Sequence, residues 1–213
     1  MIKQAIIPLA GLGTRLLPLT SVFAKELLPI NGKPGIEYIL DECIDAGIKE
    51  VIFIISKKKL MIKKYFYNDK FYKDIIKRKN DPRIISEYKK ILKYKKMIKF
   101  VFQDKPLGTG DAVLKTKKLI KDKYFLMLLP DDLIIKKNCS QSMIAIHKKF
   151  NSSVMASMTV NKNEVSRWGI YNIKKKIDNQ NFIIKSVIEK PSNKEAPSND
   201  AVIGRYILPK KIF

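Results

Sequence analysis

Short, continuous apolar runs alternate with amphipathic segments along the first part of the chain. Residues 3–9 (KQAIIPL) and 50–56 (EVIFIIS) are apolar without interruption by a polar face, which is typical of strands buried on both sides. Between them, residues 36–48 (IEYILDECIDAGI) predict an amphipathic helix, and Gly47 suits its end. The expected buried face of this helix consists of Ile36, Ile39, Leu40, Cys43 and Ile44.

The same alternation resumes after residue 97. Apolar runs predict three further strands, in IKFVFQ, YFLMLLPDD and SSVMASMTV, and amphipathic spacing predicts two helices, in GDAVLKTKKLI and SQSMIAIHKKF. Strands that alternate with helices indicate an α/β fold, here a Rossmann-like, mostly parallel sheet flanked by helices on both faces. After residue 160 the segments WGIYNI, FIIKSVIEKP and AVIGRYIL predict strands with little helix between them, so we expect a smaller mixed-sheet lobe beside the parallel core.

Residues 57–98 break the pattern. Lys and Tyr recur between isolated apolar residues, and the segment KNDPR interrupts the run. We expect helices that form a surface insertion in a single domain spanning residues 1–213. Their apolar stripe either packs on the parent domain, the more common arrangement, or forms a surface for a partner.

The charge balance is strongly basic. The 213 residues include 43 Lys and Arg against 20 Asp and Glu, a formal net charge of +23. This excess indicates either a polyanionic partner or the AT-rich codons that Lys shares with the abundant Ile, Asn, Tyr and Phe. Only five of the basic residues are Arg, and no stretch resembles a base-reading motif, so we favour the compositional explanation and expect no specific nucleic-acid partner.

Neither the cysteines nor the apolar runs indicate export or a membrane. Cys43 and Cys139 are too far apart in sequence for a redox pair or a zinc site, and both lie in predicted helices. The apolar stretch at the N-terminus is short and is followed at once by Thr14 and Arg15, which argues against a signal peptide. The later apolar runs are too short to span a bilayer. We therefore expect a cytoplasmic protein with no membrane partner.

A glycine-rich turn follows the first strand. Gly11 and Gly13 allow the backbone to approach phosphates and to direct N–H groups at them. The dinucleotide fingerprint fails because Leu16 stands where a third glycine belongs, and no G-K-[ST] completes a P-loop. Arg15 offers a guanidinium that can fork onto phosphate oxygens, and Lys25 offers a second cation.

These features together resemble a known family. The segments AGLGTRLLPLT…KELLP and NGKPGIEYILDECIDAGIKEVIFI, followed by QDKPLGTGDAV, LPDD, RWGIYNI, IEKP and NDAVIGRYIL, resemble the sugar-phosphate nucleotidylyltransferases, and within them the uridylyl branch. The resemblance covers the chain outside the insertion. It implies that UTP and glucose 1-phosphate are the substrates, that Mg²⁺ is the cofactor, and that UDP-glucose and pyrophosphate are the products.

The resemblance also implies roles for particular residues. Such a reaction joins two highly charged phosphates, so catalysis rests on alignment and charge neutralisation. Arg15, Lys25 and Lys190 are the expected catalytic cations, and Asp131, which ends a strand, is the expected Mg²⁺ ligand, with Asp132 next to it. The expected nucleotide-binding residues are Ala10, Gly11, Gly13, Thr14, Glu26, Gln103 and Gly108, and the expected sugar-binding residues are Gly169 and Glu189.

Two of these residues have roles that their chemistry makes specific. The Gln103 amide can offer both a donor and an acceptor to a base edge. Glu26 can accept hydrogen bonds from a base or a sugar, or can pair with Lys25.

Trp168 belongs either to the core or to the wall of the sugar pocket. His147 is expected to be a surface residue without a catalytic role.

Ala10 stands where thymidylyl relatives tend to have Gly, which favours the uridylyl branch. The chain departs from the family pattern in two places. Asp111 stands where many relatives have His. Relatives also continue beyond the last residue, so we expect a C-terminally truncated form with weak activity or none. The alternatives are a relative that uses dTTP or another sugar phosphate, an inactive nucleotide-binding regulatory fragment, and a basic nucleic-acid binder; the resemblance leaves a homo-oligomer open.

Overall fold

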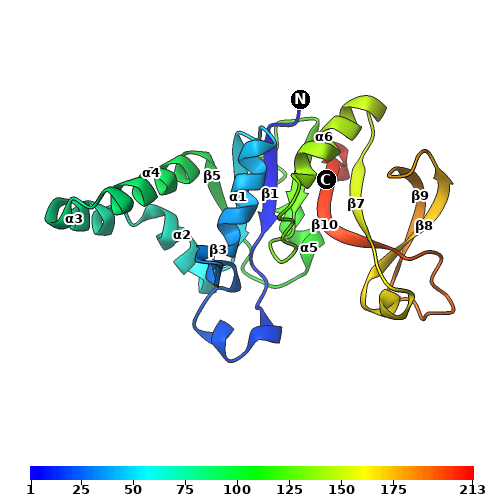
Figure 1. Cartoon of the computed structure of the whole chain (residues 1–213), viewed down its shortest axis with the longest axis horizontal. Coiled ribbons are helices and arrows are strands. Elements are labelled where there is room, and N and C mark those ends of the chain that lie inside the picture. Colours follow the sequence, from blue (N-terminus) through cyan, green and yellow to red (C-terminus); the bar gives the residue numbers. More distant parts are fainter.

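One eight-stranded sheet runs through the computed structural model, which describes all residues from Met1 to Phe213 (Figure 1). Its strand order is β5-β4-β1-β6-β10-β8-β9, and β7 pairs with β10 beside this path. The parallel part consists of β1 (Gln4–Pro8), β4 (Glu50–Ile55), β5 (Ile98–Phe102) and β6 (Tyr124–Leu128). These four strands confirm the parallel core that the apolar runs predicted.

The long strand β10 (Asp200–Pro209) joins the parallel core to the smaller lobe. It runs antiparallel to β6 through Arg205–Pro209 and antiparallel to β8 through Ala201. The remaining strands of this part are β7 (Val154–Thr159), β8 (Gly169–Lys176) and β9 (Phe182–Glu189). The prediction that β7 continues the parallel alternation is wrong, since β7 pairs antiparallel with β10, a strand that comes about 40 residues later in the chain.

Helices cover both faces of the parallel strands, as predicted. A cluster of 25 buried residues lies on the face covered by α1 (Gly35–Asp45) and α6 (Cys139–Phe150). A smaller cluster of eight lies under α5 (Thr109–Leu114) on the other face. Ile36, Ile39, Leu40 and Cys43 are fully buried, so the predicted face of α1 is confirmed.

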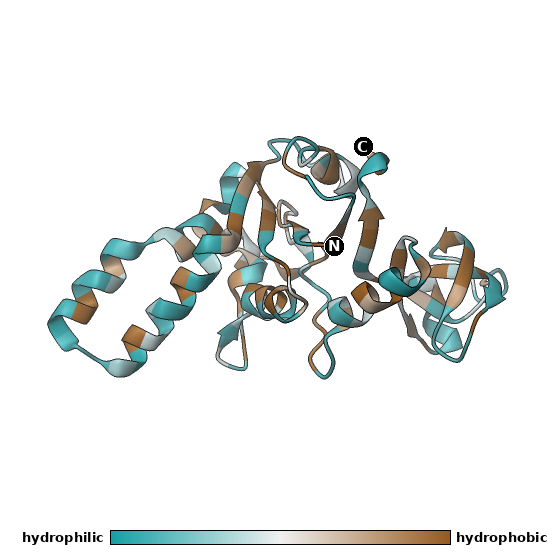
Figure 2. Ribbon diagram, turned by 90° about the horizontal axis from the view of Figure 1, so that it is seen from above, coloured by the Kyte–Doolittle hydropathy of each residue, from teal (hydrophilic) through white to brown (hydrophobic).

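Residues 57–98 form a helical arm that projects from one end of the molecule (Figures 1 and 2). It consists of α2 (Leu60–Tyr67), α3 (Asp69–Lys79) and α4 (Pro82–Met97). The root of the arm packs on the main core through residues such as Phe66 and Tyr94, whereas α3, at the tip, buries no residue. The predicted helices are therefore confirmed, and so is packing on the parent domain, but only at the root.

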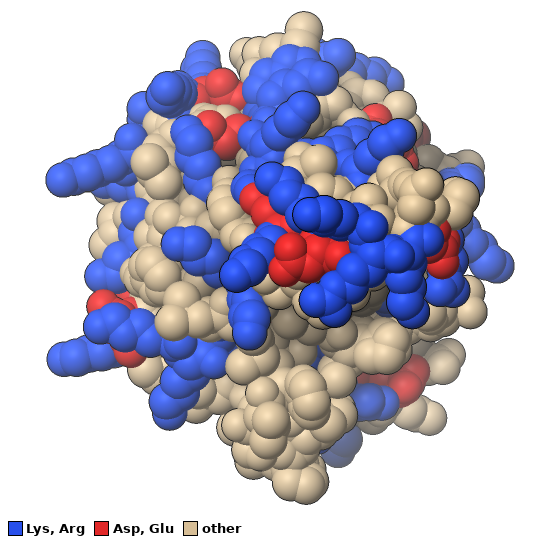
Figure 3. Space-filling model, turned by 90° about the vertical axis from the view of Figure 1, so that its left-hand side faces the viewer, with Lys and Arg blue, Asp and Glu red and all other residues tan.

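The arm also concentrates basic charge. It contains 16 of the 43 Lys and Arg residues and four of the 20 Asp and Glu residues. Figure 3, which looks onto the end of the molecule that bears the arm, shows Lys and Arg side chains spread over most of that face. Two ion pairs lie in or against the arm: Lys95 pairs with Asp69, and Lys90 pairs with Glu37 of α1.

The remaining elements are short. A two-stranded hairpin, β2 (Pro29–Ile30) and β3 (Lys33–Pro34), precedes α1. The short 3-10 helices are η1 (Thr14–Leu16), η2 (Leu19–Ser21), η3 (Lys25–Leu27), η4 (Lys57–Lys59), η5 (Lys162–Arg167) and η6 (Lys210–Ile212). No helix combines the length and the apolar character that crossing a bilayer requires.

Candidate active site

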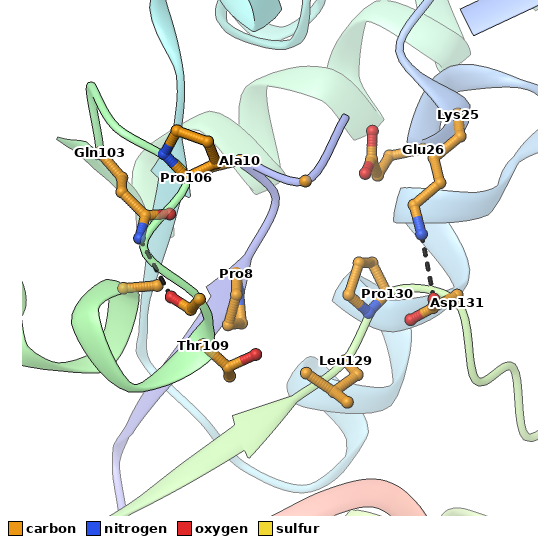
Figure 4. A pocket seen from close by; sticks show the side chains of 13 residues that line it. Pro8, Ala10, Lys25, Glu26, Gln103, Pro106, Thr109, Leu129, Pro130 and Asp131 are labelled. Atoms are coloured by element: carbon orange, nitrogen blue, oxygen red, sulfur yellow. Dashed lines mark hydrogen bonds and ion pairs between the residues drawn. The ribbon is translucent and has the colours of Figure 1, made fainter. Parts of the chain in front are cut away.

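A pocket of about 290 Å³ opens where the parallel strands β1, β5 and β6 end (Figure 4). Ligands of open α/β sheets collect at this edge, because the loops that follow parallel strands converge there. Seven of the residues predicted for the site line this pocket: Ala10, Gly11, Lys25, Glu26, Gln103, Gly108 and Asp131. Pro106, Thr109, Leu129 and Pro130 also line it and were not predicted.

The glycine-rich loop forms one rim of the pocket. Gly11 lines it, and a Cβ built on Gly11 would meet no atom within 4 Å, so the backbone there is open to a ligand. Gly13 adopts a left-handed conformation with φ of 69° before the turn Thr14–Leu16, and its carbonyl oxygen accepts a hydrogen bond from Thr20 Oγ1 at 2.8 Å. Gly13, Thr14 and Arg15 do not line the pocket itself.

Lys25 and Asp131 contact each other on one side of the pocket (Figure 4). Their side chains form an ion pair with Nζ and Oδ2 3.0 Å apart. Burial opposes ionisation of Asp131, but the hydrogen bond and charge of Lys25, together with the charge of Arg15, hold the pKa of the carboxyl below its ordinary value.

The donor set at Asp131 fits a magnesium ion that is shared with a substrate. The side chain of Asp131 is 55% exposed, so the carboxylate is accessible from the pocket. The structure contains no group of three or more His, Cys, Asp or Glu side chains that would make a complete protein cage for a metal. Mg²⁺ is commonly held by one or two carboxylates with phosphate oxygens and water, and a single carboxylate beside a phosphate-sized pocket suits that mode.

Glu26 is paired with Lys59, a residue that the sequence analysis missed. Lys59 Nζ donates to both carboxylate oxygens, at 2.7 and 2.8 Å, and both side chains are buried. Burial lowers the pKa of Lys59, and the charge of Glu26 opposes this shift only in part. Of the two alternatives for Glu26, pairing with Lys25 is wrong, because Lys25 pairs with Asp131. The sequence could not single out Lys59, which is one of three consecutive lysines.

Gln103 is held by the protein through its amide nitrogen. Its side chain is buried, and Nε2 donates to the carbonyl oxygen of Gly108 at 3.1 Å and to Asp111 Oδ2 at 2.8 Å. The expectation that this amide offers a donor to a base is therefore wrong, since both hydrogens already have partners. Only Oε1 is left to face the pocket, as Figure 4 shows.

Buried Arg205 clamps the loop that carries Asp131. Its guanidinium donates to the carbonyl oxygens of Leu129 at 3.2 Å and Asp132 at 2.7 Å, one on each side of Asp131. Glu42 balances the charge of Arg205 through contacts of 2.7 to 3.1 Å. Asp132 Oδ2 accepts from the backbone N–H of Gly204 at 2.6 Å, which gives Asp132 a structural role in this loop.

The predicted sugar-binding residues form a second group, outside the pocket, on β8 and β9. Gly169 and Glu189 are opposite each other in the strand register, and a Cβ on Gly169 would lie 3.1 Å from Glu189 Oε2. Lys190 follows with φ of 47°, and its N–H donates to the carbonyl oxygen of Trp168 at 2.9 Å. Trp168 packs on the small core of Val165, Ile170 and Ala201, which favours the core role.

Comparisons with known proteins identify the family of the chain. A family model for nucleotidyl transferases matches residues 4–213. The chain is 33% identical over its whole length to a putative UTP–glucose-1-phosphate uridylyltransferase of Methanocaldococcus jannaschii, of which it covers 74%. It is also similar to UTP-bound UGPase from Acinetobacter baumannii (32% identity, TM-score 0.90, 99% of this chain and 75% of that one). A UDP-glucose pyrophosphorylase complexed with UDP-glucose matches with 33% identity and a TM-score of 0.84, covering 99% of this chain and 77% of that one.

Proposed function

The chain belongs to the nucleotidyl transferase family, as its motifs predicted, and from this premise we propose that it transfers the uridylyl group of UTP to glucose 1-phosphate. In this reaction an oxygen of the sugar phosphate forms a bond to the α-phosphorus of UTP. The bond between that phosphorus and the bridging oxygen breaks, and pyrophosphate leaves with the electron pair. Related chains that carry UTP or UDP-glucose in their structures support these substrates.

One observation carries the proposal: Lys25, Asp131 and Gln103 converge on a single pocket from three separate parts of the chain. A cation, a carboxylate and a base-facing amide are the three groups that a nucleoside triphosphate with its metal requires. Each has an ordinary surface explanation when taken alone. Their convergence at the carboxyl ends of parallel strands has none.

The residues divide the work by charge. Lys25 and Arg15 would neutralise phosphate oxygens, and the backbone N–H groups of the glycine-rich loop would hold the phosphates in line. Asp131 would hold Mg²⁺, which, when bound, supplies positive charge to the transferring phosphates. Lys25 would then leave Asp131 for the nucleotide, because the ion and the ammonium compete for the same carboxylate.

The sugar phosphate would enter from the side of the β8–β9 lobe. Gly169 leaves room beside Glu189, whose exposed carboxylate can accept from sugar hydroxyls. The ammonium of Lys190 lies 4.0 Å from Glu189 and is exposed, so it is free to meet the attacking phosphate. A homo-oligomer stays a prediction.

The direct test measures binding and turnover separately. UTP with Mg²⁺ is titrated calorimetrically into the chain and into Lys25→Ala, with exposed Lys185→Ala as a matched control for loss of one positive charge. We expect Lys25→Ala alone to weaken UTP binding by about tenfold or more, the usual effect of losing a charge-assisted contact. Formation of UDP-glucose and pyrophosphate from glucose 1-phosphate then tests the reaction.

Two other outcomes would favour the alternatives. Tighter binding of dTTP than of UTP would indicate the thymidylyl branch. Only a direct comparison of the two nucleotides can separate the branches, because thymine presents the same hydrogen-bonding edge as uracil. Binding of UTP without any product would favour a regulatory nucleotide-binding protein. Equal effects of Lys25→Ala and Lys185→Ala would contradict the placement of the nucleotide in this pocket.

A further inference from the structure

We propose that Asp111 is a positioning residue that fixes the orientation of the Gln103 side-chain amide and thereby sets which pyrimidine the pocket accepts. The inference rests on the proposed function, which it deepens by naming the residue responsible for base choice. Asp111 does not line the pocket, so it would act only through Gln103.

Two acceptors hold the amide nitrogen. Gln103 Nε2 lies 2.8 Å from Asp111 Oδ2 and 3.1 Å from the carbonyl oxygen of Gly108. Turning the amide over would place Oε1 against two oxygens that have no hydrogen to give, so the amide has one acceptable orientation. The backbone N–H of Gln103 also donates to the carbonyl oxygen of Ile55 at 2.9 Å, which anchors the residue to the end of β4.

The charge of Asp111 strengthens this restriction. Its Oδ1 lies 3.7 Å from Nζ of Lys115, which directly follows the last residue of α5. The Asp111 side chain is mostly shielded from solvent, with 18% of its surface exposed. A carboxylate next to an ammonium is an acceptor only, and its hydrogen bond with the amide is charge-assisted. Asn at this position would offer a donor as well, and only the carbonyl oxygen of Gly108 would then oppose the turned-over amide.

The fixed orientation selects among pyrimidines. The pocket receives Oε1, an acceptor, with no donor beside it from the same side chain. Uracil and thymine carry an N–H at N3 and can donate to Oε1. Cytosine has a lone pair at N3, which Oε1 repels. Asp111 therefore excludes cytosine nucleotides without touching them and does not distinguish uracil from thymine.

The test compares UTP, dTTP and CTP on the wild-type chain and on Asp111→Asn, by calorimetry with Mg²⁺. We expect Asp111→Asn to reduce the ratio of the CTP and UTP dissociation constants by about tenfold, since a charge-assisted hydrogen bond is lost. The ratio of the dTTP and UTP dissociation constants should stay unchanged, because both bases present the same edge. The matched control is Asp104→Asn, which removes an exposed carboxylate next in sequence to Gln103. The nearest ammonium to this carboxylate is that of Lys57, at 3.9 Å.

A second measurement examines how firmly the Gln103 amide is held in the absence of nucleotide. The side-chain amide protons of Gln103, assigned by their disappearance in Gln103→Met, should exchange slowly with water in the wild type and faster in Asp111→Asn. If the CTP and UTP ratio and the exchange rate are unchanged in Asp111→Asn, the inference is overturned while the proposed function stands. If the wild-type chain binds none of the three nucleotides, the proposed function fails, and the exchange rates alone decide whether Asp111 positions Gln103.

Discussion

The buried pair of Glu26 and Lys59 makes a demanding test of the structure. Replacing Lys59 by Met keeps most of the apolar stem but removes the only partner of a carboxylate whose side chain is 1% exposed. Removing one member of a buried ion pair costs about 3–5 kcal/mol, because the other charge is left without compensation. For a chain of this length, such a loss corresponds to a fall in melting temperature of about 6–20 °C.

The decisive variant is the double substitution. Glu26→Gln combined with Lys59→Met removes both charges and keeps the shape of both side chains. Replacement of a buried pair by neutral groups is often close to neutral in stability, so we expect the double variant to recover most of the loss. Lys58→Met is the matched control, since Lys58 is exposed and adjacent in sequence, and its effect should stay within about 0.5 kcal/mol.

Urea unfolding followed by far-ultraviolet circular dichroism measures all four proteins on the same scale. The midpoints should fall in the order wild type, Lys58→Met, double variant and Lys59→Met, with similar slopes. The reasoning is refuted if Lys59→Met costs no more than Lys58→Met, or if the double variant is as unstable as the single one. The first result would mean that Glu26 finds water or another partner when Lys59 is absent. The second would mean that the loss of stability does not come from the uncompensated charge of Glu26.

Two further predictions concern the clamp and the cysteines. In Gly204→Ala the new Cβ would lie 2.5 Å from Leu129 Cβ and 2.7 Å from Asp132 Oδ2, so the loop must shift. We expect urea unfolding to show a loss of about 1–3 kcal/mol in the free energy of unfolding, together with weaker UTP binding. Unchanged stability would contradict the packing. Burial raises the pKa of both thiols, and most that of fully buried Cys43. Iodoacetamide at about pH 8 should therefore label Cys139 slowly and Cys43 only after unfolding. Raising the pH should speed the labelling of Cys139 only, and mass spectrometry identifies the labelled site.

Local pattern was sufficient for most of the fold. Strands β1 and β4 are uninterrupted apolar runs, and the buried face of α1 follows directly from helical spacing. The direction of β7 was not predictable in this way, because its partner β10 lies about 40 residues further along and nothing in either segment specifies the pairing. The division of the helical arm into a packed root and an unpacked tip was also outside the reach of periodicity.

The site was predictable where a residue contributes through its own chemistry. Lys25, Asp131 and Gln103 were identified from motifs, and the structure brings them to one pocket. Residues that act through a neighbour were missed or unexplained. The role of Asp111 follows only from its distance to the Gln103 amide, and the role of buried Arg205 only from the loop carbonyls to which it donates.

The ion pair of Lys59 and Glu26 connects the arm to the pocket. Lys59 immediately precedes the first residue of α2, and its ammonium ends on Glu26, next in sequence to Lys25. The turn between α3 and α4 can therefore tolerate a change in length, because α3 buries no side chain. The root of the arm cannot, because Lys59 has to stay within reach of Glu26. An engineer who shortens the arm can cut at the turn around Asn80 but must keep Lys59.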